Sequence, residues 1–256
     1  MKKIVAFALA LAMILTCSFA LADRLEDIKA AGKLTVATSP DWPPYEYIDD
    51  DGNIVGTDIL MVEWMAEQLG VELDLQPMAF DACLAAVGQG HVDMMVAGLT
   101  YDAERVNSMD LTGVYWNEGN QGLIVKKGEG AKYDSAEAFK GKIVAAQNGS
   151  NQQIMVEEQL PDAQLEHITK VPDGVNMVKN GRVDALAVPK TIYENILAEN
   201  DDLEVAAFVL EFDSENYVAS TKGDAAFSAK LKELIEQINA ENLYEQWLNE
   251  TQMAAK

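Results

Sequence analysis

The chain has 256 residues, of which 42 are acidic and 19 are basic, so its formal net charge at pH 7 is −23. Nucleic acids and anionic lipid surfaces are therefore poor partners, because both repel a strongly acidic protein. The length allows one large domain or two smaller lobes.

The first 22 residues have the pattern of a secretory signal peptide. Two lysines precede an apolar run, and Ala20-Leu21-Ala22 forms a small-x-small cleavage site. We expect the mature protein to begin at Asp23 and to lie in the periplasm or outside the cell. Cleavage leaves 17 of the 19 basic residues against 42 acidic ones, a net charge of −25. An uncleaved membrane anchor and lipidation at Cys17 are less favoured alternatives, the latter because Thr16 fits a lipobox poorly.

Strand-like and helix-like segments alternate from Lys33 onward, which predicts an α/β architecture with largely parallel sheets. In the first part of the chain we expect strands over 34–37, 71–75 and 92–97, and helices over 59–69 and 80–88.

Trp42 lies in a proline-rich loop that follows the first predicted strand. Three of the seven prolines of the chain fall in this loop, at positions 40, 43 and 44. Prolines hold an extended loop in place, and the carboxyl end of a strand is where open α/β sheets bind ligands. Trp42 is therefore a candidate wall of a ligand site; the alternative is that Trp42 and Tyr45 only cap the core.

The strand over 92–97 leads into Gly98-Leu99-Thr100-Tyr101-Asp102-Ala103-Glu104-Arg105. This order predicts a buried strand followed by a helix N-terminus that Asp102 caps. The free N–H groups and the dipole of such a helix favour an anion, and Thr100 adds a hydroxyl donor. Arg105 can bind a carboxylate through two parallel hydrogen bonds. Because the rest of the chain repels anions, this segment predicts a dedicated anion site.

The segment after Tyr115 is predicted to cross from one lobe to the other. It contains a strand over 120–125, and a returning strand is expected over 215–219. Two crossings imply a hinge and a cleft between the lobes. We expect lobe 1 over 23–125 plus 219–256 and lobe 2 over 126–218.

A second turn suited to anions follows a predicted strand over 142–146. Here Gly149 permits close approach to the backbone, and Ser150 or Asn151 caps the helix that follows. Since Asn148 precedes Gly149, an ordinary hairpin is the alternative.

A short repeat supports two similar lobes. Gly90-His91-Val92-Asp93 is echoed by Gly181-Arg182-Val183-Asp184, and each precedes an apolar strand, the second over 185–188. The motif is short, so a chance match is the alternative. The C-terminal stretch 227–248 has helical spacing of apolar residues and predicts a packing helix pair.

The sequence offers little for metal, cofactor or hydrolase chemistry. His91 and His167 are the only histidines, and neither has a partner at ligand spacing. No glycine-rich phosphate motif and no nucleophile elbow occur. Glu118 and Glu215, near the two crossings, are the candidate acid/base groups, with a solvated acidic surface as the default interpretation.

Taken together, these features resemble the bacterial family 3 extracellular solute-binding proteins, the periplasmic amino-acid receptors of ABC importers. The resemblance covers residues 23–256 and depends on the order and spacing of short motifs. These motifs are Lys33-Leu34-Thr35-Val36-Ala37 with Pro44-Tyr45-Glu46, Gly56-Thr57-Asp58-Ile59, Val92-Asp93, Leu99-Thr100 with Arg105, Gly149-Ser150, and Gly181-Arg182-Val183-Asp184-Ala185. The resemblance implies a type II periplasmic-binding-protein fold, in which two hinge strands join two lobes, each with a mainly parallel sheet flanked by helices.

The resemblance also implies the roles of individual residues. Arg105 would bind the α-carboxylate of the ligand, with help from Thr100 and the Ser150-Asn151 turn. Trp42 and Phe80 would sandwich the ligand side chain, and the carbonyl of Gly98 would accept from the ammonium group. The predicted ligand-binding set is Ser39, Trp42, Phe80, Gly98, Thr100, Arg105, Gln147, Ser150, Asn151 and Lys190.

One departure from the family pattern concerns the ligand ammonium. The family usually places an aspartate where this chain has Pro189 and Lys190, and a cation there would repel an ammonium ion. Either another anion replaces the aspartate, or Lys190 points outward, or the ligand carries a second anionic or a neutral polar group. The candidate replacements are Glu118, Glu215 and Asp41. Ser39 stands where receptors for basic amino acids tend to keep an aspartate, so a basic ligand is less favoured.

We therefore expect a monomeric solute-binding receptor of an ABC importer, not an enzyme, which closes its lobes on a small carboxylate-bearing solute such as an amino acid. Its partner would be the membrane permease, and it would need no cofactor or metal. The alternative is a periplasmic enzyme on the same scaffold, similar to cyclohexadienyl dehydratases, with Glu118 or Glu215 as the general acid.

Overall fold

The computed structural model describes residues 23–212 and 214–254. The predicted signal segment 1–22, with Cys17, lies outside these residues. Within the part of the chain that is described, no helix is long and apolar enough to cross a membrane.

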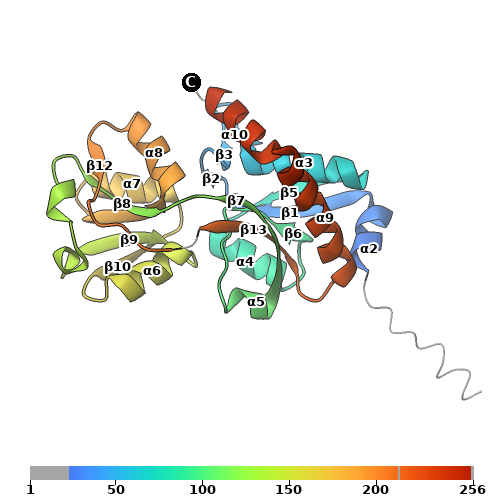
Figure 1. The fold of residues 1–256 in the computed structure, drawn as a ribbon, viewed down its shortest axis with the longest axis horizontal. Coiled ribbons are helices and arrows are strands. Elements are labelled where there is room, and N and C mark those ends of the chain that lie inside the picture. Colours follow the sequence, from blue (N-terminus) through green and yellow to red (C-terminus); the bar gives the residue numbers. More distant parts are fainter. Residues whose placement is uncertain (1–22, 213, 255–256) are drawn as a thin grey trace, which may run out of the picture.

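Two five-stranded sheets with the same strand pattern form the two lobes (Figure 1). The lobe 1 sheet has the order β5 (Glu72–Pro77), β1 (Lys33–Thr38), β6 (Met94–Met95), β13 (Glu215–Thr221), β7 (Met109–Asn117). The lobe 2 sheet has the order β10 (Gln164–Ile168), β9 (Ile143–Gln147), β11 (Ala185–Pro189), β8 (Gln121–Lys126), β12 (Leu203–Val205). In each sheet the first three strands of this order are parallel to one another. The fourth strand pairs antiparallel with both the third and the fifth. The lobes are therefore similar in fold, as the α/β, two-lobed prediction requires.

The chain passes between the lobes twice, from β7 to β8 and from β12 to β13 (Figure 1). By strand pairing, β8 belongs to the lobe 2 sheet and β13 to the lobe 1 sheet. Residues 121–125 and 215–218 thus pair in the opposite lobe from the one expected. The apolar pattern of a crossing strand looks the same in either sheet, so pattern alone does not assign it.

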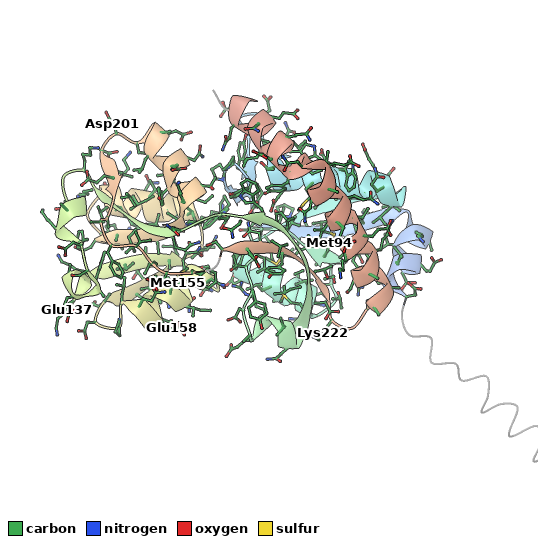
Figure 2. The ribbon with its side chains drawn as sticks, in the orientation of Figure 1. Met94, Glu137, Met155, Glu158, Asp201 and Lys222 are labelled. Atoms are coloured by element: carbon green, nitrogen blue, oxygen red, sulfur yellow. The ribbon has the colours of Figure 1, made fainter. Side chains whose placement is uncertain are left out.

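Helices cover the sheets of both lobes. In lobe 1 these are α2 (Arg24–Ala31), α3 (Thr57–Leu69), α4 (Phe80–Gly88), α5 (Arg105–Ser108), α9 (Ala225–Glu241) and α10 (Leu243–Ala254). In lobe 2 they are α6 (Asn151–Gln159), α7 (Val171–Lys179) and α8 (Lys190–Glu199), with short 3-10 turns over Gly130–Lys132 and Ala136–Phe139. Figure 2 shows Met94 inside lobe 1 and Met155 inside lobe 2, while Glu137, Glu158 and Asp201 lie at the outer surface.

A small third sheet carries Trp42 toward the junction of the lobes. It consists of β2 (Asp41–Trp42), β3 (Glu46–Ile48) and β4 (Ile54–Val55), in that order. Gly56 follows it with a φ of 133°, and a Cβ there would lie 2.1 Å from the carbonyl oxygen of Tyr45. Only glycine allows this approach, which brings the start of α3 against the loop that holds Trp42.

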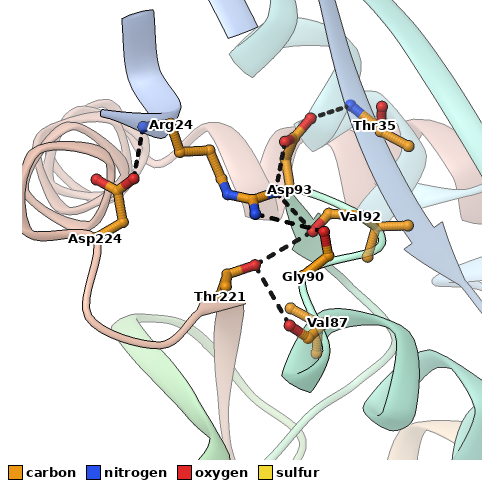
Figure 3. A network of polar contacts seen from close by, with 8 residues as sticks. All are labelled: Arg24, Thr35, Val87, Gly90, Val92, Asp93, Thr221 and Asp224. Carbon is orange, nitrogen blue, oxygen red and sulfur yellow. Dashed lines mark hydrogen bonds and ion pairs between the residues drawn. The ribbon is translucent and has the colours of Figure 1, made fainter. Parts of the chain in front are cut away.

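The repeated Gly-x-Val-Asp motif has a structural role in both lobes. In lobe 1 the Asp93 carboxylate accepts from the backbone N–H of Thr35 at 2.8 Å, and Arg24 holds its other oxygen at 2.9 Å (Figure 3). In lobe 2 Asp184 accepts from the backbone N–H of Ile143 at 2.8 Å. Asp93 thus ties the start of β6 to β1, and Asp184 ties the start of β11 to β9. The repeat is therefore real, and it stabilises the sheets rather than forming the site.

Two expected elements are shorter than the sequence suggests. The strand predicted over 92–97 is regular only over Met94–Met95, and the helix expected near Asp102 is the four-residue α5. Residues 96–100 instead run as irregular chain along β1 and β13, where Val96 donates to Ala37 and Leu99 accepts from Tyr217.

Candidate functional site

A small enclosed cavity lies where the two lobes meet. Lobe 1 contributes Trp42, Phe80, Ala97, Gly98, Thr100 and Arg105, and lobe 2 contributes Gln147, Ser150, Asn151 and Gln152. The cavity volume is about 10 Å³, close to the space that one water needs. A larger solute is therefore accommodated only when the lobes stand further apart than in this structure.

Eight of the ten predicted ligand-binding residues line this cavity, and two do not. Ser39 donates to Asp41 Oδ1 at 2.9 Å instead. The Lys190 side chain is 52% exposed and pairs with Glu194 at 3.6 Å along α8. Lys190 thus points away from the cavity, as one of the alternatives anticipated.

Two residues of the cavity wall, Ala97 and Gln152, were not predicted from the sequence. Gln152 lies in the first turn of α6 directly after Asn151. Its position next to a predicted helix cap could have marked it as a residue of the site. Its Nε2 donates to Gln121 Oε1 at 2.8 Å, which links α6 to the crossing strand β8. Ala97 directly precedes Gly98, and nothing in its residue type marks a site.

Arg105 is a buried cation at the junction of the lobes. Its side chain donates to the carbonyls of Thr100 in lobe 1 and Gly149 in lobe 2, both at 2.8 Å. The guanidinium lies 5.7 Å from the centre of the Phe80 ring. Burial lowers the pKa of Arg105 to about 10, so it remains charged at neutral pH. Among the described residues no carboxylate forms an ion pair with it. A carboxylate would offset the cost of burying this charge.

The expectation that the helix N-terminus beside Arg105 attracts an anion is wrong. Asp102 Oδ1 already accepts from the backbone N–H groups of Glu104 at 2.8 Å and Arg105 at 3.1 Å. With only four residues, α5 also has almost no macrodipole. The attraction for an anion at this position therefore comes from the Arg105 side chain.

The turn before α6 matches the strand-turn-helix prediction. Ser150 is the capping residue, because its Oγ accepts from the backbone N–H of Gln153 at 3.2 Å. Asn151 donates from Nδ2 to the carbonyl of Tyr101 at 3.0 Å, which is a contact between lobes. Its Oδ1 is buried and has no hydrogen-bond partner among the described residues. Asn151 thus presents an acceptor at the cavity wall.

Asp41, one of the three candidates to replace the family's aspartate, already binds other groups of the protein. Its carboxylate accepts from Ser39 in lobe 1 and from Gln147 Nε2 at 3.1 Å and the backbone N–H of Val171 at 2.9 Å in lobe 2. Burial raises its pKa despite these bonds. Asp41 therefore joins the lobes directly rather than facing the cavity.

The other two candidates differ in position. Glu118 is buried at the end of β7, and its Oε1 lies 3.4 Å from Trp42 Nε1. The same oxygen is 3.4 Å from where a Cβ on Gly98 would stand. Glu215 instead accepts from the Tyr217 hydroxyl at 2.9 Å, and it does not line the cavity. Of the two, the structure brings only Glu118 against the cavity wall.

Two further carboxyl groups lie behind this wall. Asp58, at the start of α3, accepts from the hydroxyls of Tyr244 at 2.6 Å and Tyr115 at 2.9 Å. Burial raises the pKa of Asp58 to about 6 and that of Glu118 to about 8. Burial, followed by the charge of Asp58, raises the pKa of Glu46 well above its ordinary value. Glu46 and Asp58 belong to the family motifs quoted above, but the sequence assigned neither of them a role.

A wider groove reaches Arg105 and Ser150 from outside. It has a volume of about 840 Å³ and runs between α4 and α5 on one side and α6 on the other. The acidic residues of its lining are Asp102, Glu104, Glu157 and Glu158. Among the described residues no group of three histidines, cysteines or carboxylates is placed to hold a metal ion.

Comparison with known proteins gives a consistent result. The model of the bacterial extracellular solute-binding proteins, family 3, matches residues 34–250. The arginine-binding extracellular protein ArtP of Bacillus subtilis is 32% identical over 209 residues, which cover 81% of this chain and 78% of ArtP. The L-cystine-binding protein TcyJ of Escherichia coli is 26% identical over 234 residues, 90% of this chain and 88% of TcyJ.

A solved structure agrees with these relatives. The amino acid ABC transporter substrate-binding protein AbpA of Streptococcus pneumoniae, bound to L-arginine, superposes with a TM-score of 0.84 at 32% identity. The match covers 88% of this chain and 97% of AbpA.

Proposed function

Because this chain belongs to the bacterial extracellular solute-binding proteins, family 3, we propose that it is the receptor of an ABC importer and captures an amino acid between its two lobes. Its partner is the permease of that importer. We further propose export to the periplasm or cell exterior by the segment 1–22. Of the relatives named above, ArtP is an arginine-binding protein, TcyJ is an L-cystine-binding protein, and AbpA is a substrate-binding protein of an amino acid ABC transporter.

The observation that carries this proposal is the buried guanidinium of Arg105 at a cavity that both lobes line. The α-carboxylate of an amino acid would accept two parallel hydrogen bonds from Arg105 and replace its bonds to backbone carbonyls. Thr100 and Ser150 line the same cavity and supply further donors. Since Arg105 reaches lobe 2 at Gly149, a ligand at this position would contact both lobes and stabilise closure.

Trp42 and Phe80 form the apolar part of the site. Both side chains are buried in lobe 1 and line the cavity. We propose that they enclose the ligand side chain, while the carbonyl of Gly98 accepts from the ammonium group.

Replacing Trp42 with alanine is expected to weaken binding by about 1–3 kcal/mol, roughly 5- to 150-fold, because a large apolar contact is lost. Isothermal titration calorimetry measures the change. Tyr101→Ala is the matched control, since the Tyr101 side chain is 53% exposed and does not line the cavity. An unchanged dissociation constant for Trp42→Ala would return Trp42 to a purely structural role.

The identity of the ligand is tested with a thermal-shift panel on residues 23–256. Ligands that bind only the folded state raise the melting temperature by mass action. The panel contains the standard amino acids, cystine, dicarboxylates and prephenate. Arginine, cystine and histidine are included because similar proteins are named for binding them. We expect a shift with one or a few amino acids. A flat response to every amino acid would contradict the proposed function.

We also propose that the protein catalyses no reaction. Glu118 is a buried carboxyl against the cavity wall and is the candidate general acid of the enzyme alternative. Prephenate is therefore incubated with the protein and analysed by mass spectrometry. Recovery of unchanged prephenate is the expected result, and its conversion would favour the enzyme alternative.

A further inference from the structure

Three buried carboxyl groups, Glu46, Asp58 and Glu118, form a cluster behind the cavity wall, which we call the carboxyl cluster. Two of its members act on residues that line the cavity. Glu118 Oε1 accepts from Trp42 Nε1 at 3.4 Å, and the backbone N–H of Gly98 helps to hold down the pKa of Asp58. The cluster therefore lies directly behind Gly98, whose carbonyl we propose as the acceptor for the ligand ammonium.

Among the described residues, Glu118 forms no ion pair with a lysine or arginine. The titratable groups that act on it or respond to it are Asp58 from α3, Glu46 from β3, Tyr45 from the turn before β3, and Tyr115 from β7. From β13 it faces the uncharged Asn216. Two cations of this region bond elsewhere: Arg105 to backbone carbonyls, and Lys190 to Glu194. A third, Lys170, acts on Asp41.

The residues that directly follow Glu118 lie beside the position where the family pattern has its aspartate. Pro189, at the end of β11, pairs with Gln121, and the backbone N–H of Lys190 donates to the carbonyl of Asn120 at 2.9 Å. The segment that follows Glu118 thus runs alongside the end of β11, where Pro189 stands in place of the family's aspartate. An anion on this segment would therefore be placed to bind the ligand ammonium in place of the family's aspartate.

We propose that the ammonium group of the bound amino acid drives the proton off Glu118, so that each capture event releases one proton and leaves Glu118 as the counter-ion of the ligand. This inference rests on the proposed function. The carboxylic acid of Glu118 becomes a carboxylate, and its proton passes to the solvent while the ligand keeps its own ammonium protons. Glu46 and Asp58 stay in place behind it.

The physical reason is electrostatic. A buried carboxyl without a cation favours its neutral form, and an adjacent cation lowers the pKa of a carboxyl by about one to three units. The protonated form of Glu118 cannot neutralise the ammonium, so binding favours the ionised form. Affinity should therefore rise with pH, by up to about tenfold per unit, between the lowered pKa of Glu118 in the complex and its pKa of about 8 in the free protein, and it should level off outside that range.

The test is calorimetry at pH 7 with L-arginine as the first probe and L-glutamine as the second. Titrations in phosphate and in Tris, which differ in ionisation enthalpy, give the number of protons released. We expect release of roughly half to one proton for the wild-type protein, because a fall of about one to three units from a pKa of about 8 leaves Glu118 half to fully ionised in the complex at pH 7. We expect almost none for Glu118→Gln, whose affinity should also lose its pH dependence. Glu215→Gln is the matched control, because the Glu215 carboxylate accepts from the Tyr217 hydroxyl, whereas that of Glu118 accepts from Trp42 of the cavity wall. It should release as many protons as the wild-type protein.

Each outcome separates the two proposals. Binding by the wild-type protein without proton release overturns the inference, and so does proton release that persists in Glu118→Gln. Failure of the folded wild-type protein to bind any amino acid overturns the proposed function instead. If Glu118→Gln does not fold, infrared difference spectra of the wild-type protein decide. Loss of one protonated carboxyl absorption on adding the probe supports the inference, and an unchanged carboxyl region overturns it.

Discussion

Replacing Arg105 with alanine is expected to abolish amino-acid binding, with a loss of about 3 kcal/mol or more, which exceeds 100-fold in the dissociation constant. The guanidinium is the buried cation of the cavity, and a ligand carboxylate that has left water would find no partner without it. Arg105→Lys should also bind weakly, because an ammonium group cannot supply two parallel hydrogen bonds. Calorimetry with the amino acid identified by thermal shift gives both values.

The fold should survive the loss of Arg105. Arg105→Ala removes the desolvation cost of the buried cation together with its hydrogen bonds to the carbonyls of Thr100 and Gly149, so the opposing effects should leave the melting temperature of the free protein little changed. Arg182→Ala is the matched control, because Arg182 is exposed in lobe 2, and it should bind normally. Retained affinity in Arg105→Ala would rule out Arg105 as the carboxylate clamp.

Replacing Asp58 with alanine is expected to lower the free energy of unfolding by about 2–5 kcal/mol, at about 1–3 kcal/mol for each buried hydroxyl left without an acceptor. Asp58 accepts from the hydroxyls of Tyr115 and Tyr244, which join β7 and α10 to the start of α3. Its removal leaves both hydroxyls buried without an acceptor, which costs more than the lost bonds themselves. Urea unfolding followed by circular dichroism measures the change.

The control for Asp58 is Asp201→Ala, a change at an exposed aspartate of lobe 2 (Figure 2). Its free energy of unfolding should stay within about 0.5 kcal/mol of the wild-type value. A similarly small effect for Asp58→Ala would show that the two tyrosines find other partners, and it would remove Asp58 from the support of the cavity wall.

Local patterns predicted the elements that are regular and the turns that cap them. The helix over Phe80–Gly88 and the cap at Ser150 follow from apolar spacing and from capping chemistry. The same rules overestimated the segment after Val92, because 96–100 is held by contacts with β1 and β13 rather than by a regular strand of its own. A turn with Asp102 and Arg105 looks like a helix start in sequence, although its N–H groups are occupied by Asp102 itself.

The sequence by itself determined the family, the two-lobed α/β fold and most of the residues at the cavity, because short motifs such as Leu99-Thr100 with Arg105 keep their order and spacing along the chain. Only the tertiary structure decided which carboxylate faces which partner. Asp41 is bonded across the lobes, Lys190 pairs along α8, and Glu118 lies against Trp42 and Gly98. These assignments join residues far apart in the chain, and the burial that shifts their pKa values exists only after the lobes have packed.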